Sequence, residues 1–530
     1  MRHWDWIFLV GIFLLVAIIR LRLLGVPLER DEGEYAYAGQ LILHGVLPYD
    51  QAYNMKMPGI YAAYAVILAL FGQTHHAIHA GVLLINLLSA LFLFLLARDL
   101  LGRTAGVAAA AFFALLSASS AVLGLSANAE HFVLVFALPG ILLTKRSLDA
   151  HQPALLACGA LLLGLAFLMK QHGAAFIAFM GLYVLVRELT CRPCRPRRLL
   201  LHGALYLIGV AFPFALCCAV LAWGGVFHTF WFWTFDYARE YVRLMPLSHG
   251  LPNLKHQIGQ ILRGAPLVWL FLPAGLIWFL RRKAWKLLAF VAAFLLFSFL
   301  AVCPGWFFRE HYFLLLLPAL ALLAGAGAKA CQDLSLRLRP KRPAPLLPLI
   351  AALVALAHYL WLQRVPFFQA TPLQVSRLIY GLNPFPEALE LGRYLREHTR
   401  PGDRIAILGS EPEILFYARR RSPTGYIYAY PLLEPQPYAL RMQEDMIRQI
   451  EAAPPEYLIF VQCPLSWLGG PDSPARIFDW LNQFQPEHYQ PFGVIDILGP
   501  QNTRYLWGDA LRGYEPQSPL GIRVFKRKAS

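Results

Sequence analysis

Long apolar runs recur along the first 362 residues of the chain, and short polar gaps separate them. Most runs are about 17 to 25 residues long, which as an α-helix is enough to cross the hydrocarbon core of a bilayer. We therefore predict a polytopic α-helical membrane protein with about eleven spanning helices. The expected spans lie near 5–25, 78–97, 104–122, 131–144, 153–169, 173–187, 199–223, 265–280, 287–303, 311–328 and 345–362.

The gap after the first span is unusually long, at 26–77, and it contains one short apolar stretch at 60–71. That stretch is too short to cross a bilayer comfortably. We expect it to form a helix that lies in the membrane interface.

Beyond residue 362 the pattern changes from long apolar runs to short apolar strands and amphipathic helices. Strands that alternate with helices indicate a small α/β layer domain. We therefore divide the chain into a transmembrane domain at 1–365 and an α/β domain at 366–530. The expected strands are 404–409, 426–430 and 457–461, and the expected helices are 411–417, 438–452 and 473–484. The turn Gly409-Ser410-Glu411-Pro412 is interpreted as structural.

The distribution of charge predicts the topology. Hydrophobic residues make up 58% of the chain, and the formal net charge is +16. In a soluble protein that charge would suggest nucleic-acid binding. Here 18 Lys and Arg residues fall in alternate short gaps between apolar runs, as the positive-inside rule requires. We therefore expect a cytosolic N-terminus, an extracytosolic α/β domain and no nucleic-acid partner.

The first extracytosolic gap carries a cluster of carboxylates and a lysine. Asp31, Glu32 and Glu34 follow the first span directly, and Lys56 precedes Met57-Pro58 at the start of the interfacial helix. A partly desolvated carboxylate can act as a general base, so Asp31 is the candidate base. An acidic first helical turn is the structural alternative. Lys56 could pair with a phosphate or could snorkel to the interface.

Three further polar groups fall on the same predicted face. Glu130 stands in a short turn and could share the proton transfer, or the turn could simply be polar. Lys170 and Arg309 could hold a phosphate, although Arg309 could instead pair with its neighbour Glu310. The other candidate substrate-binding residues are Glu32, Tyr35, Asn128, His131, His311 and Tyr312.

Three segments together resemble a known family. The first loop reads Asp31-Glu32-Gly33-x-Tyr35, then Gly45-x-x-Pro48-Tyr49-Asp50, then Lys56-x-Pro58-Gly59-x-Tyr61. This pattern resembles the first external loop of bacterial polyprenyl-phosphate-sugar-dependent glycosyltransferases of the GT-C fold. These are relatives of the protein O-mannosyltransferases and of the aminoarabinose transferase that modifies lipid A. The stretches at 164–171 and 308–318 resemble weaker motifs of the same superfamily.

The resemblance implies an inverting transfer of a sugar from a polyprenyl phosphate to a glycan, lipid or protein acceptor at the bacterial inner membrane. It implies that Asp31 is the base and that Lys56 faces the phosphate. Relatives with a metal site have an acidic residue just before that lysine. This chain has Met55 there. We therefore predict no definite metal ligand, with a divalent cation left as a possible cofactor.

A lipid-linked glycan transporter or flippase is the alternative function. Such proteins carry ionisable residues near helix midpoints and broken helices in matching halves. The charges in this chain fall at helix ends, and the sequence has no evident two-half symmetry. The transferase interpretation is therefore favoured.

Overall fold

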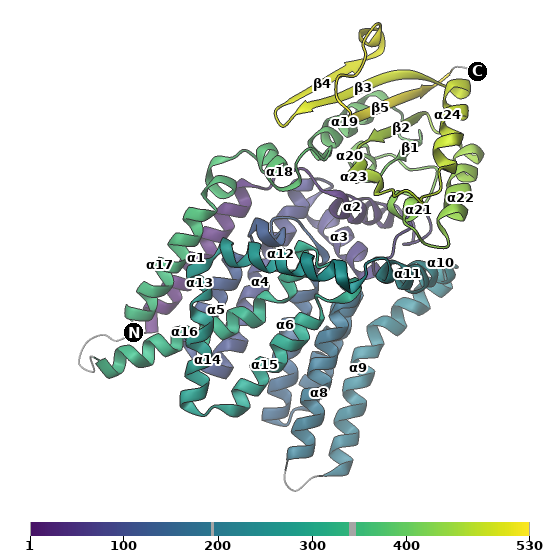
Figure 1. Ribbon diagram of the computed structural model, residues 1–530. Helices are drawn as coiled ribbons and strands as arrows, with labels where there is room; N and C mark the ends of the chain where they lie inside the picture. The colour runs from purple at the N-terminus through teal and green to yellow at the C-terminus, as the bar shows by residue number, and fades with distance from the viewer. Residues whose placement is uncertain (1, 192–194, 339–345, 529–530) are drawn as a thin grey trace.

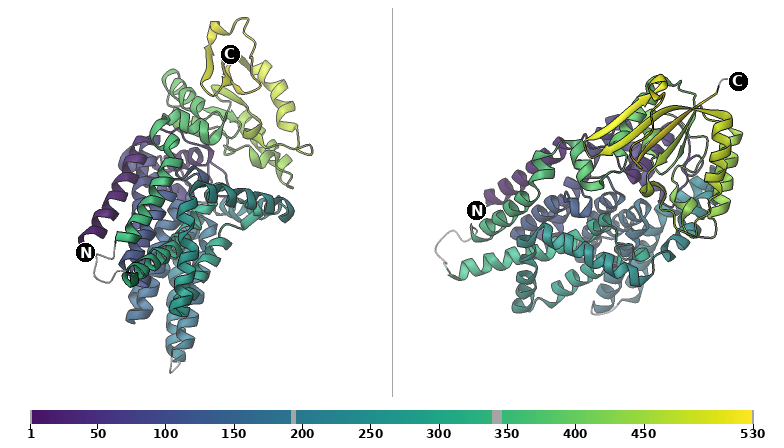
Figure 2. Two further views of the ribbon diagram at one scale, coloured as in Figure 1. Left: turned by 60° about the vertical axis from the view of Figure 1, so that its left-hand side comes forward. Right: turned by 45° about the horizontal axis from the view of Figure 1, so that its top comes forward.

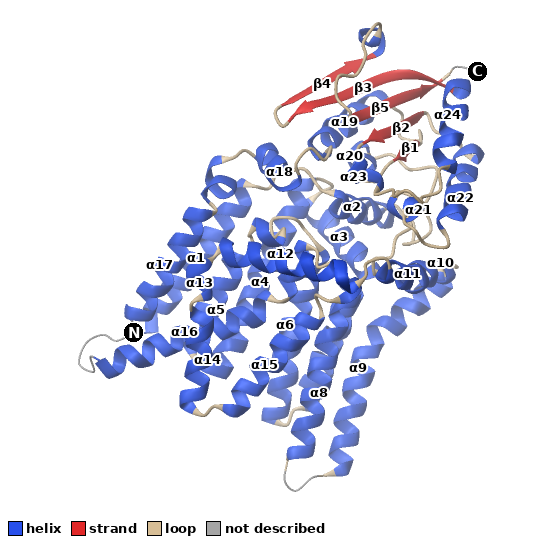
Figure 3. Cartoon of the chain, viewed as in Figure 1, coloured by secondary structure: helices blue, strands red, loops and turns tan. Residues whose placement is uncertain are grey.

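The computed structural model describes residues 2–191, 195–338 and 346–528. A bundle of helices forms one end of the molecule, and a mixed sheet with its covering helices forms the other (Figure 1). All the strands of the described residues lie in the C-terminal part (Figure 3). The change of composition near residue 362 thus coincides with a change of architecture.

The bundle is built from helices that follow the apolar runs of the sequence. Proline at the first helical positions of α3, α7 and α9 marks their starts, as is common for helix N-termini. The main bundle helices are α1 (Arg2–Arg22), α4 (His75–Leu101), α5 (Arg103–Leu116), α6 (Ala129–Ala150), α7 (Pro153–Met169), α8 (Ala174–Thr190), α9 (Pro196–Trp223), α13 (Pro266–Trp269), α14 (Phe271–Arg282), α15 (Trp285–Leu300), α16 (Leu317–Leu338) and α17 (Leu346–Leu362).

Four helices of the described part are individually long and apolar enough to cross a membrane. They are α4, α6, the continuous segment Gln171–Thr190 and α9. A fifth span results if the pair Leu247–Gly264 and Pro266–Arg282, bent by 98°, counts as one. Shorter apolar helices coincide with other apolar runs of the sequence. The chain is therefore a multi-pass membrane protein, and the number eleven stays a prediction.

Two expectations for the external side of the bundle are wrong. No helix was expected in the region 227–264, between the spans at 199–223 and 265–280. This region forms α10 (Phe227–Trp231), the π-helical η3 (Phe232–Tyr237), α11 (Ala238–Arg243) and α12 (Leu247–Gly264). Helix α12 is amphipathic and therefore lacks a continuous apolar run. The span expected at 311–328 begins later, because the 3₁₀ segment η5 (Glu310–Leu315) precedes α16. Short 3₁₀ segments also form η1 (Ser120–Val122), η2 (Gln171–Gly173) and η4 (Pro304–Trp306).

The long gap 26–77 is folded around two helices, α2 (Arg30–Leu43) and α3 (Pro58–Phe71). A capping box starts α2, because the Glu29 side chain accepts a hydrogen bond from the Glu32 amide and Glu32 bonds back to the Glu29 amide. The helix expected at 60–71 is confirmed by α3. Both helices lie between the bundle and the sheet (Figure 1).

The C-terminal part contains a five-stranded sheet in the order β1-β2-β5-β3-β4. Only β1 and β2 pair in parallel, and the other neighbours are antiparallel. Figure 2 shows helices packed against this sheet in both further views. The elements are η6 (Val365–Gln369), α18 (Pro372–Tyr380), α19 (Phe385–His398), β1 (Ile405–Leu408), α20 (Glu413–Ala418), α21 (Tyr430–Leu433), α22 (Ala439–Ala452), β2 (Tyr457–Gln462), α23 (Pro464–Trp467), α24 (Arg476–His488), β3 (Tyr489–Gly499), β4 (Asn502–Trp507), η7 (Gly508–Leu511) and β5 (Gly521–Arg527).

The strands expected at 404–409 and 457–461 are confirmed by β1 and β2. The strand expected at 426–430 is wrong. Those residues are irregular and lead into α21, because their alternating tyrosines have no neighbouring strand to pair with. Strands β3, β4 and β5, which complete the sheet, were not expected.

The C-terminal part rests directly on α2. The buried Arg30 guanidinium lies 2.9 Å from Glu411, which also accepts a hydrogen bond from the Ser466 hydroxyl at 2.5 Å. A Cβ atom on Gly33 would lie 2.6 Å from the backbone nitrogen of Glu413, so only glycine allows this close approach. The turn around Glu411, interpreted as structural, therefore anchors the sheet to α2.

Candidate active site

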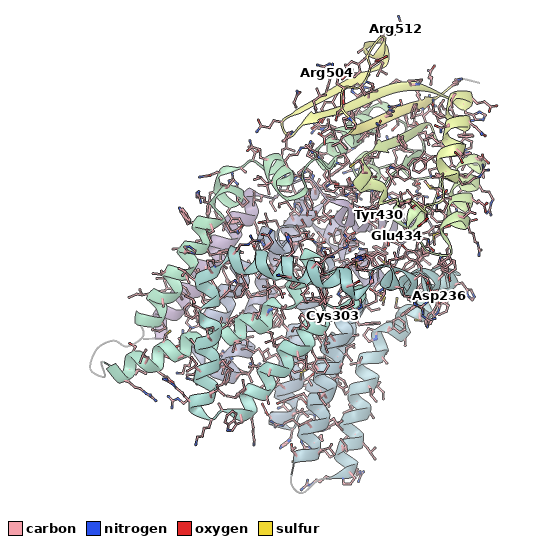
Figure 4. The ribbon with its side chains drawn as sticks, in the orientation of Figure 1. Asp236, Cys303, Tyr430, Glu434, Arg504 and Arg512 are labelled. Atoms are coloured by element: carbon pink, nitrogen blue, oxygen red, sulfur yellow. The ribbon has the colours of Figure 1, made fainter. Side chains whose placement is uncertain are left out.

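A closed-in cavity of about 230 Å³ lies at the junction of the bundle, α2 and the C-terminal part. Tyr430 and Glu434, which line it, lie between the sheet and the bundle in Figure 4. Segments that are far apart in the sequence, between residues 29 and 434, contribute to its wall. The wall is formed by Glu29, Arg30, Asp31, Asn54, Met55, Lys56, Leu123, Tyr237, Tyr241, Arg309, Glu310, His311, Tyr312, Tyr380, Phe385, Tyr428, Tyr430, Pro431 and Glu434.

Asp31 and Lys56 form an ion pair in this wall. The Lys56 ammonium donates to Asp31 Oδ2 at 2.8 Å, and each side chain retains 15% of its accessible surface. The first turn of α2 positions Asp31, and Lys56 is held immediately before α3, where its carbonyl accepts the Tyr49 hydroxyl at 2.6 Å. The two residues that the first-loop pattern singled out are therefore in contact.

A third group completes this arrangement. The Tyr428 hydroxyl, from the C-terminal part, donates to Asp31 Oδ1 at 3.2 Å. Each carboxylate oxygen of Asp31 thus accepts a hydrogen bond from a different domain of the chain. The carboxylate is consequently fixed in orientation while one face remains open to the cavity.

The electrostatic surroundings keep Asp31 ionised. Burial alone would raise its pKa, but the positive charge of Lys56 and its hydrogen bond hold the pKa of Asp31 well below its usual range. Burial would lower the pKa of Lys56, but the negative charge of Asp31 raises it above its ordinary value. The resting pair is therefore carboxylate and ammonium at all physiological pH values.

The other two carboxylates of the cluster are held in structural contacts. Glu34 accepts the Tyr61 hydroxyl at 2.5 Å and the Asn54 amide at 2.6 Å, and burial raises the pKa of Glu34 to about 8. Glu32 accepts the Ala127 amide at 2.5 Å and contacts His79 at 3.0 Å. Neither side chain belongs to the cavity wall. Their contacts set the position of α2.

Glu130 and Lys170 form a second buried ion pair, at 2.5 Å, just behind the wall. The Lys170 ammonium also lies 4.3 Å from the centre of the Tyr312 ring, which does line the cavity. Lys170 therefore contacts a side chain of the cavity wall, and Glu130 pairs with Lys170. In the same layer, Asn128 is the N-cap of α6 and His131 contacts the Gly124 carbonyl at 3.2 Å.

Arg309, His311 and Tyr312 line the cavity, as the sequence predicted for a site. Arg309 lies 5.4 Å from the Phe307 ring centre and donates to the Tyr241 hydroxyl at 3.5 Å. Within the described ranges no carboxylate forms an ion pair with it. The buried Tyr35 ring packs 5.5 Å from the Lys56 ammonium and supports it from behind.

The wall residues of the C-terminal part were not predicted from the sequence. These include Tyr428, Tyr430 and Glu434, together with Tyr380 and Phe385 from α18 and α19. The alternating tyrosines at 426–430 were the available signal, and it was interpreted as a strand. Six tyrosines in all face the cavity, a supply of hydroxyl groups and ring faces suited to a polyhydroxylated ligand.

The donor set for a metal ion is poor. Within residues 2–191, 195–338 and 346–528, no three His, Cys, Asp or Glu side chains gather at a distance that could hold one. The carbonyl of Met55, at the position of the relatives' acidic residue, already accepts the Gln171 side-chain amide at 2.9 Å. The residues present do not fit a resident divalent cation.

Comparisons with known proteins bear on the fold of the chain. The sequence model of the family described as dolichyl-phosphate-mannose-protein mannosyltransferase matches residues 55–223. No curated protein sequence matches the chain. The fold is similar to that of ArnT from Cupriavidus metallidurans. For ArnT bound to undecaprenyl phosphate the identity is 16%, the TM-score is 0.55, and 98% of this chain and 97% of that chain are covered.

The apo form of the same ArnT gives 17% identity and a TM-score of 0.56, covering 99% of this chain and 98% of that one. The archaeal oligosaccharyltransferase AglB from Archaeoglobus fulgidus, in complex with an inhibitory peptide and a dolichol-phosphate, is more distant. It gives 14% identity and a TM-score of 0.52, covering 98% of this chain and 76% of that one. The resemblance that the sequence indicates is therefore confirmed: this chain is a membrane protein of the GT-C fold, similar to the protein O-mannosyltransferases and to ArnT.

Proposed function

We propose that the protein is an inverting glycosyltransferase that moves a sugar from a polyprenyl phosphate to an acceptor on the extracytosolic face of the membrane. The acceptor class is an envelope glycan, lipid or protein. The observation that carries the proposal is the Asp31–Lys56 pair in the wall of a cavity lined by six tyrosines. A base and a phosphate-binding cation side by side are what this reaction requires.

Asp31 and Lys56 together account for the proton and the leaving group of the reaction. The acceptor hydroxyl or amine attacks the anomeric carbon from the face opposite the phosphate, and its proton passes to the Asp31 carboxylate. The bond between the anomeric carbon and the phosphate oxygen breaks, and the electron pair leaves with the polyprenyl phosphate. Lys56 stabilises that leaving group by charge, with Arg309 as a second donor in the same wall.

The ion pair between Asp31 and Lys56 provides a way for the donor to control the basicity of Asp31. While Lys56 is bound to Asp31, the lowered pKa makes that carboxylate a weak base. A donor phosphate competes for the Lys56 ammonium and removes most of this stabilisation. The basicity of Asp31 therefore rises only when the donor is bound. Donor binding thus prepares Asp31 to take the proton of the acceptor.

The second pair, Glu130 and Lys170, supports this exchange from behind the wall. Lys170 adds positive charge near Asp31 and Tyr312 without lining the cavity. Glu130 neutralises Lys170 and leaves its second carboxylate oxygen without a hydrogen-bond partner in the described residues. We assign the pair to electrostatic support of the phosphate site and keep Glu130 as the second candidate base.

Mass spectrometry of envelope glycolipids and glycans, with and without the protein, tests this function. Loss of a single sugar modification, together with accumulation of the unreacted polyprenyl-phosphate sugar, is the expected result. Loss of a lipid-linked glycan transporter would instead leave its cargo on the cytosolic leaflet. Purified protein in nanodiscs should transfer sugar from a lipid donor without any second compartment, which a transporter cannot do.

Tyr428 is expected to act as a positioning residue for the base. In Tyr428→Phe, Asp31 loses the hydrogen bond to Oδ1, which favours the ionised form. The pKa of Asp31 should rise, and the acidic limb of the kcat profile should move to higher pH. Removing one such bond to a charged group should lower the rate at neutral pH roughly tenfold.

The matched control is Tyr426→Phe, from the same irregular segment. The Tyr426 hydroxyl contacts Asp445 at 3.3 Å, and its side chain does not line the cavity. The control should keep the wild-type pH profile. Identical profiles for both variants would show that Tyr428 only fills space.

The proposed topology places residues 364–530 outside the cytosol. A reporter that is active only in the cytosol should therefore be inactive when fused after Ser530, and active when fused before Met1. An active C-terminal fusion would place the Asp31 cavity on the cytosolic side and contradict the location of the proposed reaction.

A further inference from the structure

A second, larger hollow opens at the other end of the bundle from the Asp31 cavity. It has a volume of about 900 Å³ and lies between α8 and α15, where the ends of α4, α6 and α9 close it. These helix ends point away from the sheet, toward the bottom of Figure 1. We call this hollow the α8–α15 groove. The proposed transferase chemistry makes no use of it.

The wall of the α8–α15 groove changes from charged to apolar along its length. The charged section lies at the helix ends, and the apolar section lies closer to the middle of the helices, as in a lipid whose headgroup meets hydrocarbon chains. The charged section consists of Asp99, Lys145, Asp149, Arg187, Glu188, Arg198 and Lys286. The apolar section includes Phe179, Leu182, Val186, Leu287, Phe290 and Ala293.

The charges in this wall leave an excess of cations. Asp149 accepts from Lys145 at 2.8 Å and from Arg187 at 3.0 Å, and Glu188 lies 3.1 Å from Arg198. The exposed Lys286, in the first turn of α15, forms no ion pair with any residue of the described segments. One ammonium in the groove is therefore available to an anion from outside the protein.

We propose that the α8–α15 groove binds one anionic phospholipid from the adjacent leaflet. Its phosphate would lie against Lys286, and its acyl chains would lie along the apolar faces of α8 and α15. A zwitterionic lipid fits less well, because its own cationic group would meet the positive end of the groove. The polyprenyl donor is not the occupant, because its phosphate must reach Lys56 at the opposite end of the bundle. The exclusion of the donor rests on the proposed function, whereas the phospholipid site itself rests on the wall of the groove.

Native mass spectrometry of the full-length protein, with phosphatidylglycerol or phosphatidylcholine added to delipidated samples, tests the proposal. Wild type should bind one phosphatidylglycerol in preference to phosphatidylcholine. Lys286→Gln should weaken the binding of phosphatidylglycerol about fivefold, the effect expected for one cation at a membrane surface. The control Lys283→Gln removes an equally exposed lysine at the end of α14, outside the groove, and should bind like wild type.

A second variant tests the apolar section without changing the charge. Ala289 is an exposed residue in the groove wall, so Ala289→Trp fills the hollow without disturbing the packed core. This variant should lose the bound phospholipid and keep wild-type thermal unfolding in detergent. Equal binding of the two lipids, unchanged binding in both groove variants, or retention of a polyprenyl phosphate as the bound lipid would each overturn the proposal.

Discussion

Replacing Asp31 with Asn is expected to slow sugar transfer about 10²–10⁴-fold, the loss typical for a missing general base. The amide keeps the size of the side chain and can still accept the Tyr428 hydrogen bond, but it cannot take a proton. Lys56 remains available to the donor phosphate, because the competing carboxylate is gone. The variant should therefore bind the lipid donor at least as well as wild type while it turns over very slowly.

The measurement is single-turnover transfer by purified protein in nanodiscs, with donor binding determined in parallel. Glu34→Gln is a matched control, because it removes a neighbouring carboxylate that does not line the cavity. It should have a milder effect on the rate of the folded protein, as should Glu32→Gln. Near-normal transfer by a folded Asp31→Asn protein would assign the base elsewhere, with Glu130 as the next candidate.

Replacing Lys56 with Ala is expected to impair donor use more than any other single change of a cation. One charge-assisted contact to a phosphate is worth about 1.5–3 kcal/mol, roughly a ten- to hundredfold effect on kcat/KM for the donor. The pKa of Asp31 should also return toward its usual range, because the stabilising charge is lost. The acidic limb of the activity profile should therefore move to higher pH.

Steady-state kinetics with a varied concentration of lipid donor, at several pH values, measures both effects. Lys255→Ala is the control, since Lys255 is an exposed lysine of α12 outside the cavity. It should leave the kinetics unchanged. If Lys56→Ala uses the donor normally, Lys56 serves only to pair with Asp31, and Arg309 becomes the main phosphate ligand.

The sequence predicted the part of the candidate site that lies within one loop. Asp31 and Lys56 are 25 positions apart, within one loop whose pattern resembles that of a family, and the structure brings them to 2.8 Å. Apolar runs likewise predicted most bundle helices, because hydrocarbon demands length and continuity. Helices with only one apolar face were harder to predict from the sequence. Helix α12 alternates between apolar and polar sides and was therefore taken for a loop.

The remaining part of the site could not be predicted because it depends on contacts between distant segments. Tyr428 reaches Asp31 across 397 positions, and no local signal indicates that partner. The same holds for Glu411 and Arg30, which are 381 positions apart. An irregular segment with alternating tyrosines has the pattern of a strand. Only the fold shows that Tyr428 and Tyr430 line the cavity instead of facing a neighbouring strand.

The position of β5 makes the sheet depend on a strand that follows all of its neighbours in the sequence. This last strand, Gly521–Arg527, lies in the middle of the sheet, where it is the only link between the β1–β2 pair and the β3–β4 hairpin. Until these residues have been synthesised and have joined the sheet, the domain that carries Tyr428 is incomplete. The candidate site around Asp31 and Lys56 thus depends, through Tyr428, on a sheet whose central strand lies far from both residues in the sequence.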